Sequence, residues 1–201
     1  MLFRSGKRGR RNLSRLQQGP FDKVDHIKLL HKLDRIGVSS QVTRWVQSLL
    51  TGRSQTVVVD GYESSSCPVT SAVPQGSVIG PILFLVYIND LPDSVLSKTR
   101  LFADDTVIYN TSDNSQQLQD DLNALQSWET SWKMEFNPLK CVHVKFSRKR
   151  TKGAENQYIL HNVQIPKADG VKYLGVKLES SLRWNDNTTY ITNKASSRLG
   201  Y

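Results

Sequence analysis

Apolar and polar residues alternate along residues 101–109, and two adjacent carboxylates, Asp104 and Asp105, interrupt the alternation. A period of two predicts half-buried strands, and neighbouring aspartates favour a turn. The pattern therefore predicts a strand, a tight turn and a second strand, with both acids at the tip. Paired carboxylates suit Mg²⁺, which takes oxygen ligands, although a solvated Asp-Asp turn has the same pattern.

Two amphipathic helices are predicted upstream of this hairpin. In the first, which begins near Phe21, apolar residues recur three to four apart, with Asp22 as the expected N-cap and Gly37 as the stop. The second covers residues 40–50 and ends at Gly52. Together they are expected to form a helical hairpin.

The middle of the chain predicts a ribbon followed by a buried helix. Asp60-Gly61 joins two β-rich runs, residues 55–59 and 62–69, and this dipeptide is a strong hairpin signal. Residues 78–91 are apolar on nearly all sides, which predicts a buried helix despite Gly80 and Pro81 near its start.

The second half of the chain predicts a long helix and then short strands. Residues 114–133 are amphipathic, and Trp128 and Trp132 are expected to pack on the sheet rather than to stack on nucleic acid. Residues 141–146 alternate and predict a strand that closes the sheet. A small hairpin is expected at residues 157–165, a further strand at residues 171–178, and a helix from Trp184 onward.

The positive charge is concentrated at the N-terminus. The chain has 27 Lys and Arg against 18 Asp and Glu, a net charge of +9, and residues 1–20 hold six of the basic residues and no acid. A basic excess favours a polyanionic partner, or it serves solubility. Residues 1–20 fit a transit peptide, a nuclear localisation segment or a disordered tail, and disorder is the favoured prediction. The six residues are Arg4, Lys7, Arg8, Arg10, Arg11 and Arg15.

Cysteine and histidine usage excludes several classes of site. Cys67 and Cys141 are too few for a disulfide framework or a cysteine zinc site, and no His stands at ligand spacing from another ligand. The longest apolar run, residues 82–88, is too short to cross a bilayer. We expect an intracellular protein, nuclear or cytoplasmic, with free thiols and no membrane span.

Two motifs in a fixed order carry a resemblance to a known family. Residues 71–91 include Pro74-Gln75-Gly76-Ser77, and Phe102-Ala103-Asp104-Asp105 follows. They resemble the polymerase domain of reverse transcriptases from non-LTR (LINE-type) retrotransposons, from about Phe21 to the end of the chain. The resemblance implies an α+β fold, namely a right-hand polymerase palm with partial fingers and a thumb largely missing, and RNA-directed DNA polymerase activity.

The resemblance also implies roles for individual residues. Asp104 and Asp105 would be the catalytic carboxylates and would bind Mg²⁺, with Mn²⁺ as an alternative. The partners would be an RNA template, a DNA primer and deoxynucleoside triphosphates. Template and nucleotide would contact Gln75, Gly76 and Ser77, with Phe21 under the sugar and Lys140 near the leaving pyrophosphate; the primer grip would be Tyr173, Leu174 and Gly175.

Plainer alternatives stay open for three of these positions. Gly76 is also what a helix-entry turn requires, Phe21 also fits a hydrophobic staple, and Lys140 also fits an exposed turn. Each alternative gives the residue a structural rather than a ligand-binding role.

The sequence departs from the family at one metal ligand. The family carries a third carboxylate on the strand before Phe21, and the matching position is Leu16. The expected parts are a basic leader unrelated to the family (1–20), a palm with partial fingers (21–183) and the start of a thumb-like helix (184–201). Two hypotheses follow: an impaired polymerase, or a catalytically dead remnant that at most binds nucleic acid.

Overall fold

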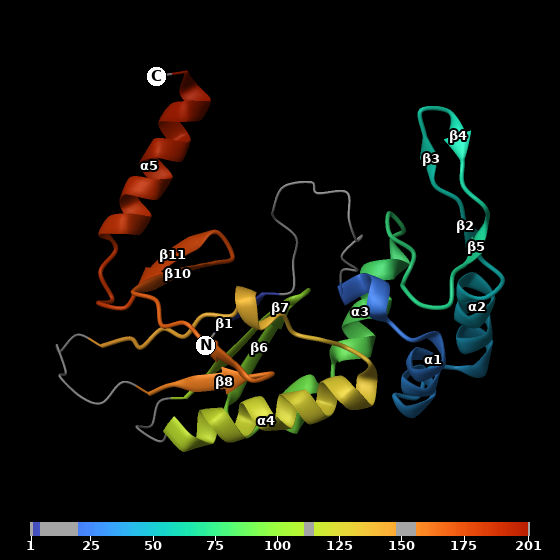
Figure 1. The fold of residues 1–201 in the computed structure, drawn as a ribbon, viewed down its shortest axis with the longest axis horizontal. Coiled ribbons are helices and arrows are strands. Elements are labelled where there is room, and N and C mark those ends of the chain that lie inside the picture. Colours follow the sequence, from blue (N-terminus) through green and yellow to red (C-terminus); the bar gives the residue numbers. More distant parts are fainter. Residues whose placement is uncertain (1, 5–19, 111–114, 148–155, 201) are drawn as a thin grey trace. The chain divides into compact units, whose positions relative to one another are not determined.

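A computed structural model of the 201-residue chain describes residues 2–4, 20–110, 115–147 and 156–200. The fold is α+β, as predicted (Figure 1). The chain divides into two compact units. Unit 1 comprises Met1–Arg4, Leu96–Asn123 and Phe136–Tyr201, and unit 2 comprises Ser5–Val95 and Ala124–Glu135.

Unit 2 contains the predicted helical pair. Helix α1 (His26–Arg35) follows a short 3-10 helix, η1 (Pro20–Lys23), and helix α2 spans Ser40–Leu50, the predicted bounds. The N-cap of α1 is Asp25, whose side chain accepts a hydrogen bond from the Lys28 N–H at 3.1 Å. The expected cap, Asp22, was wrong, because the 3-10 turn delays the helix start by one turn.

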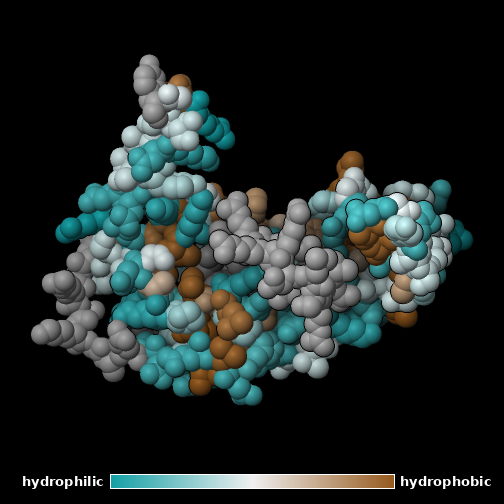
Figure 2. Space-filling view, turned by 45° about the horizontal axis from the view of Figure 1, so that its top comes forward, coloured by the Kyte–Doolittle hydropathy of each residue, from teal (hydrophilic) through white to brown (hydrophobic). Residues whose placement is uncertain are grey.

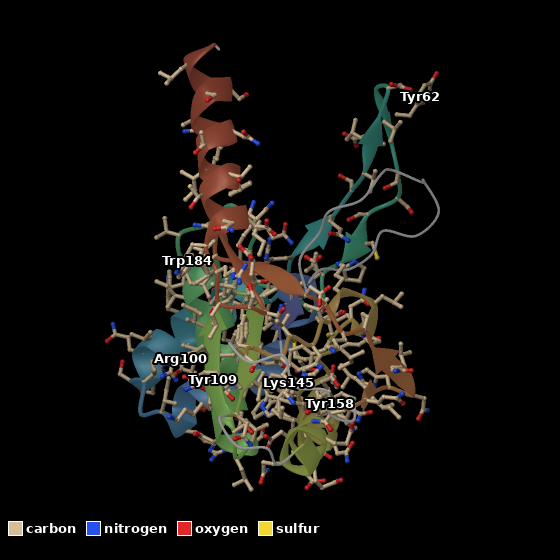
Figure 3. The ribbon with its side chains drawn as sticks, turned by 90° about the vertical axis from the view of Figure 1, so that its left-hand side faces the viewer. Tyr62, Arg100, Tyr109, Lys145, Tyr158 and Trp184 are labelled. Carbon is tan, nitrogen blue, oxygen red and sulfur yellow. The ribbon has the colours of Figure 1, made fainter. Side chains whose placement is uncertain are left out.

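A narrow ribbon follows α2. Strands β2 (Ser54–Gln55) and β5 (Cys67–Pro68) pair at its base, and β3 (Val58–Val59) pairs with β4 (Tyr62–Glu63) at its tip. Asp60 and Gly61 have φ of 52° and 83°, the left-handed values that a two-residue hairpin turn needs. The predicted ribbon is confirmed, and Tyr62 stands at its exposed end (Figure 3).

Helix α3 (Ile79–Ile88) is less buried than its composition predicts. Leu83, Phe84 and Tyr87 are in the core, whereas Ile82 and Leu85 are about half exposed. The predicted helix is confirmed, but it is buried only in part. A helix whose residues are apolar on every side carries no polar stripe, so its sequence cannot show which face is covered. A 3-10 helix, η2 (Leu91–Ser94), follows α3.

A buried lysine joins three helices within unit 2. The Lys32 side chain on α1 is only 3% exposed, and its ammonium donates to the backbone oxygen of Tyr87 and to Asp90. The same ammonium lies 3.7 Å from the ring centroid of Trp132, and Trp128 Nε1 donates to Asp90 at 2.9 Å. Both tryptophans belong to helix α4 (Ser115–Trp132) and contact side chains of α1, of α3 and of the residues that follow α3. The prediction that they pack on the sheet was therefore wrong.

Unit 1 is built on a three-stranded antiparallel sheet in the order β1-β7-β6 (Figure 1). Strands β6 (Lys98–Phe102) and β7 (Asp105–Tyr109) form the predicted hairpin, and β1 (Leu2–Arg4) pairs along the other edge of β7. On α4, the carboxylate of Asp121 is buried and accepts hydrogen bonds from the backbone N–H groups of Leu96 and Ser97, which fixes the approach to β6.

Two further hairpins and a helix complete unit 1. The predicted small hairpin is confirmed as β8 (Tyr158–Leu160) and β9 (Val163–Ile165). The single strand predicted at residues 171–178 was wrong, because β10 (Gly170–Tyr173) and β11 (Val176–Glu179) form a hairpin there. Helix α5 (Asn185–Leu199) has no buried residue, and its visible surface is largely hydrophilic (Figure 2).

The segment expected to close the sheet does not form a regular strand. Within residues 141–146, isolated bridges stand at residues 142 and 143, and His143 pairs in parallel with Lys167; the segment follows the 3-10 helix η3 (Pro138–Lys140). Cys67 and Cys141 are both free cysteines. Among the described residues, no helix is long and apolar enough to cross a membrane.

Candidate active site

The carboxylates Asp104 and Asp105 occupy the tip of the β6–β7 hairpin. Phe102 and Asp105 are the last paired residues, so Ala103 and Asp104 form a two-residue turn. Ala103 has φ of 50°, a left-handed conformation that is unusual for alanine. Both carboxylates are half-buried. The predicted position of the acids at a bend between paired strands is confirmed.

The burial of β7 explains how the tip is held. Thr106 and Ile108 are 2% and 1% exposed, so alternate residues of this strand are anchored in the core of unit 1. On β6, the Arg100 guanidinium lies 5.9 Å from the ring centroid of Tyr109 across the hairpin, and Figure 3 shows both residues on this ribbon. A rigid hairpin thus presents the two acids at its end.

The oxygen ligands at this tip are of the kind that a hard divalent cation binds, but they come from two residues. Asp104 and Asp105 supply carboxylate oxygens, which Mg²⁺ prefers. Across the ranges that the structure describes, no group of three His, Cys, Asp or Glu residues comes together to hold a metal. Leu16, the position that matches the family's further aspartate, lies outside the described residues.

Strand β1 is an element that the sequence did not predict. The expected leader was disordered, yet Leu2–Arg4 pairs with β7 in antiparallel register, and Arg4 is the register partner of Asp105. The sequence offers only a weak signal, because two apolar residues, Leu2 and Phe3, are too short a run to specify a strand. The rest of the leader, residues 5–19, lies outside the described residues.

In unit 2, the loop that contains Gln75 is fastened to the segment that contains Phe21. The Val73 N–H donates to the Phe21 oxygen at 3.1 Å, and the Ala72 N–H donates to the Val24 oxygen at 2.9 Å. The Ser71 hydroxyl donates to the Asp22 backbone oxygen at 2.9 Å. These contacts bring Phe21 and residues 74–77, far apart in sequence, into one place.

The side chains of this loop have distinct surroundings. The Phe21 ring stacks on Phe84 with centroids 4.2 Å apart, and Gln75 Nε2 donates to the carboxylate of Asp22. The Ser77 hydroxyl donates to the Pro74 oxygen at 2.6 Å and accepts from the Gly80 N–H at 3.0 Å, so it is engaged inside the loop. Gly76 has φ of 82° and open space around its Cα. Gln75 and Gly76 are therefore the exposed part of the motif.

The other expected site residues belong to unit 1. Lys140 ends η3, which contacts both β1 and β9. Tyr173, Leu174 and Gly175 lie at the turn of the β10–β11 hairpin, where Leu174 and Gly175 have φ of 46° and 89°. The site residues are thus gathered in two groups, one in each unit.

A basic and aromatic cluster on β10, β11 and α5 was missed from the sequence. Lys172 and Lys177 are direct cross-strand partners, and their ammonium groups lie 4.3 and 5.2 Å from the ring centroid of Tyr190. Lys172 also donates to the Tyr190 hydroxyl at 2.5 Å, and this hydrogen bond lowers the pKa of that phenol. The signal in the sequence would have been a hairpin that brings Lys172 and Lys177 together, but residues 171–178 were predicted to form a single strand.

Comparison with known proteins identifies the class. A family model described as reverse transcriptase (RNA-dependent DNA polymerase) matches residues 17–178. The chain belongs to this family.

The relatives that match this chain are polymerases of mobile elements. The chain is 35% identical over 188 residues, 87% of its length, to the RNA-directed DNA polymerase from mobile element jockey of Drosophila melanogaster. It is 30% identical over 90% of its length to the protein of the same name from Drosophila funebris. It is 30% identical over 89% of its length to a probable RNA-directed DNA polymerase from transposon X-element of Drosophila melanogaster.

The predicted resemblance to reverse transcriptases of non-LTR elements is confirmed by these matches. The chain spans about a fifth of the length of these curated relatives, since it covers 20%, 21% and 20% of them.

Proposed function

We propose that this chain is the palm, with part of the fingers, of an RNA-directed DNA polymerase that extends a DNA primer with deoxynucleoside triphosphates on an RNA template. The observation that carries the proposal is the position of Asp104 and Asp105 at the rigid tip of a β-hairpin, in a chain that belongs to the reverse transcriptase family. In this proposal, residues 21–183 form the palm and partial fingers. Residues 184–201, which contain α5, begin a thumb-like helix.

The proposed metal site consists of Asp104 and Asp105. A bound Mg²⁺, or Mn²⁺ in its place, would supply positive charge for the phosphates of the nucleotide. The chain's own contribution is to hold the two carboxylates on a short turn whose flanking strands are paired along their length. Such preorganisation keeps the ligands in place without further ordering at the moment of reaction.

The proposed nucleotide site consists of Phe21, Gln75 and Gly76. The Phe21 ring is held by Phe84 and would exclude a sugar that carries a 2′ hydroxyl. Gly76 lets the backbone approach a ligand closely, and Gln75 supplies a hydrogen-bonding side chain. Ser77 would act mainly by shaping the loop, since its hydroxyl bonds Pro74 and Gly80. In the same proposal, Lys140 lies near the leaving pyrophosphate, and Tyr173, Leu174 and Gly175 grip the primer.

The same observations favour a second function, that of a catalytically dead remnant which binds nucleic acid. Leu16 stands where the family has a metal-binding aspartate, and the described residues hold no group of three metal ligands. Phosphoryl transfer between two metals needs carboxylates that bridge both ions. We therefore propose that any polymerase activity of this chain is impaired.

Primer extension with Mg²⁺ on an RNA template tests both functions. The chain, its Leu16→Asp variant and an Asp104→Asn control of each are compared. Extension that rises with Leu16→Asp and disappears with Asp104→Asn supports the polymerase. No extension by any of the four, together with nucleic-acid binding that Asp104→Asn leaves unchanged, supports the remnant.

A further inference from the structure

One side-chain contact at the proposed nucleotide site has no role in the function proposed above. Gln75 Nε2 donates a hydrogen bond to Oδ1 of Asp22. An ionised carboxylate only accepts hydrogen bonds, so the end of the Gln75 amide that faces Asp22 has to be its nitrogen. The carbonyl oxygen of Gln75 is then the end left to face a ligand.

We propose that Asp22 is a positioning residue, which orients the Gln75 amide so that its carbonyl oxygen accepts a hydrogen bond from a sugar hydroxyl of the incoming nucleotide. This inference rests on the proposed function. Asp22 itself touches neither the nucleotide nor the metal in this proposal. Its effect is transmitted through Gln75.

The contact is not needed to hold the loop together. Backbone hydrogen bonds from Ala72 and Val73 to Val24 and Phe21 fasten the loop independently of either side chain. His26 Nε2 is also 2.8 Å from the Ala72 oxygen. Gln75 is exposed, and an exposed hydrogen bond adds little to stability. A bond that fixes an exposed amide without stabilising the fold is what a specificity device requires.

The electrostatics indicate which part of a nucleotide Gln75 faces. The oxygens of a triphosphate only accept hydrogen bonds, and the negative charge of Asp22 beside Gln75 repels them. A sugar hydroxyl can donate to the Gln75 oxygen. The Phe21 ring, placed in the same region by the bond from Val73 to its backbone oxygen, supplies an apolar surface that suits a sugar better than a phosphate.

The test measures nucleotide binding by the full chain, not activity. Isothermal titration calorimetry with Mg²⁺ compares dATP with 2′,3′-dideoxy-ATP, which lacks the sugar hydroxyl. The variants are Asp22→Ala, Gln75→Ala, the double variant, and Asp22→Asn, whose amide oxygen can still accept from Gln75. Asp34→Ala is the matched control, because Asp34 is an exposed aspartate of the same unit on α1.

We expect the wild type to prefer dATP, and Asp22→Ala to lower that preference by about 3–10-fold, the worth of one neutral hydrogen bond. Asp22→Asn should retain part of the preference, and Asp22→Ala should have no further effect once Gln75 is alanine. Asp34→Ala should leave the preference unchanged. A merely structural role for Asp22 would lower binding of both nucleotides equally.

Two outcomes overturn the inference and are distinguishable from each other. If the wild type prefers dATP and Asp22→Ala behaves like Asp34→Ala, Asp22 does not position Gln75, and the proposed function survives. If the wild type binds neither nucleotide, the proposed nucleotide site fails, and the role of Asp22 fails with it.

Discussion

Ala103 adopts a conformation that favours glycine, immediately before the first of the two carboxylates. Its φ is 50°, and the left-handed region costs an L-residue about 1–2 kcal/mol. Strain of this kind persists where the surrounding structure fixes it, and here the paired strands on both sides do so. The cost falls on the residue that sets the direction of Asp104.

Replacing Ala103 with glycine should relieve that strain. Glycine also gains about 0.4–1 kcal/mol of freedom in the unfolded chain, so we expect a net stabilisation of roughly 0.5–1 kcal/mol. Urea unfolding measures the change. Ala124→Gly, in the interior of α4, is the control and should destabilise by about 1 kcal/mol. Equal destabilisation by both substitutions would show that Ala103 is not strained.

His143 is a buried imidazole whose charge the fold disfavours. Its ring lies 4.7 Å from that of Tyr158, which is labelled in Figure 3, and burial, together with nearby positive charge that includes Lys167 and Lys145, lowers its pKa to about 4. The unfolded chain binds the proton near pH 6.5. Between these values the unfolded state holds more protons than the folded state, so stability rises with pH.

His143 should therefore cost the protein stability as the pH falls from 7 to 5. We expect a loss of about 2 kcal/mol from this group over that interval. The His143→Gln variant lacks the titration, so the difference in unfolding free energy between it and the wild type should shrink by this amount at pH 5. His31→Gln, at an exposed position of α1, is the matched control for replacing a histidine with glutamine.

At the scale of elements, the start of α1 is set by Asp25. Burial alone would raise the pKa of Asp25, but the hydrogen bonds from Lys133 and from the Lys28 N–H outweigh it, and the pKa is lowered. The stability from this carboxylate is therefore present above the unfolded pKa and lost as the pH falls through the folded one.

Substituting each aspartate in turn should show which of the two caps helix α1. Asp25→Ala should cost about 1–2 kcal/mol, because an N-cap and the contact with Lys133 are lost together. Asp22→Ala should cost clearly less, since Asp22 does not cap the helix. Thermal unfolding followed by circular dichroism at 222 nm gives both values. A larger loss of stability for Asp22→Ala than for Asp25→Ala would show that Asp22 is the cap, as predicted from the sequence.

The packing of α1, α3 and α4 depends on the charge of Lys32. Burial lowers the pKa of Lys32, and Asp90 opposes that shift. Removing Asp90 leaves the ammonium buried beside aromatic rings without its carboxylate, and Trp128 loses its hydrogen-bond acceptor. A buried charge that loses its partner is more costly than a pair replaced by an apolar side chain.

Substitutions at the two ends of this pair should therefore be unequal. We expect Asp90→Ala to destabilise by about 2–4 kcal/mol, and Lys32→Met by about 1 kcal/mol or less. Tryptophan fluorescence during urea unfolding reports on both, because Trp128 and Trp132 belong to the cluster. Glu135→Ala removes the exposed partner of Lys23 and should change stability by no more than about 1 kcal/mol. Equal effects at Asp90 and Lys32 would mean that the lysine is hydrated.

The sequence predicted elements best where local rules decide them. The apolar spacing and Gly52 gave α2 its bounds, and Asp60-Gly61 gave the ribbon its turn. The turn at Leu174 was missed, because a leucine with φ of 46° breaks the propensity by which turns are recognised. Strand β1 was missed since its partner β7 is about a hundred residues away, and pairing over that distance leaves no local pattern.

At the scale of the whole molecule, residues of the candidate site were predicted where they belong to a sequence motif. Motifs in the sequence predicted that Asp104 and Asp105 lie on a hairpin and that Phe21 lies near Gln75. In the structure, strand pairing places the two acids, and backbone hydrogen bonds bring Phe21 to the Gln75 loop. Asp22 was read as a helix cap, and its contact with Gln75 depends on tertiary structure. The cluster around Tyr190 needed a hairpin register that the sequence did not reveal.

The uneven charge of the chain makes a prediction about nucleic-acid binding. Residues 1–20 contribute six of the nine net positive charges, and the remainder of the chain is nearly balanced. If these residues contact phosphates, each contact releases counterions, and the salt dependence of binding counts the contacts. Replacing all six basic residues with glutamine should flatten the slope of log Kd against log salt by up to about 4 for single-stranded RNA. Fluorescence anisotropy with a labelled RNA, from about 50 to about 200 mM salt, measures this slope.

A charge-preserving variant tells phosphate contacts from a sequence-specific role of the same segment. With its five arginines changed to lysine, the segment keeps its charge, and the slope should match the wild type. Asp104→Asn should likewise leave the slope unchanged, because in the proposed function the hairpin tip contacts the nucleotide and not the RNA backbone. If the glutamine variant keeps the wild-type slope, the N-terminal charge serves solubility, and RNA is bound by residues in the rest of the chain, whose excess is only three charges.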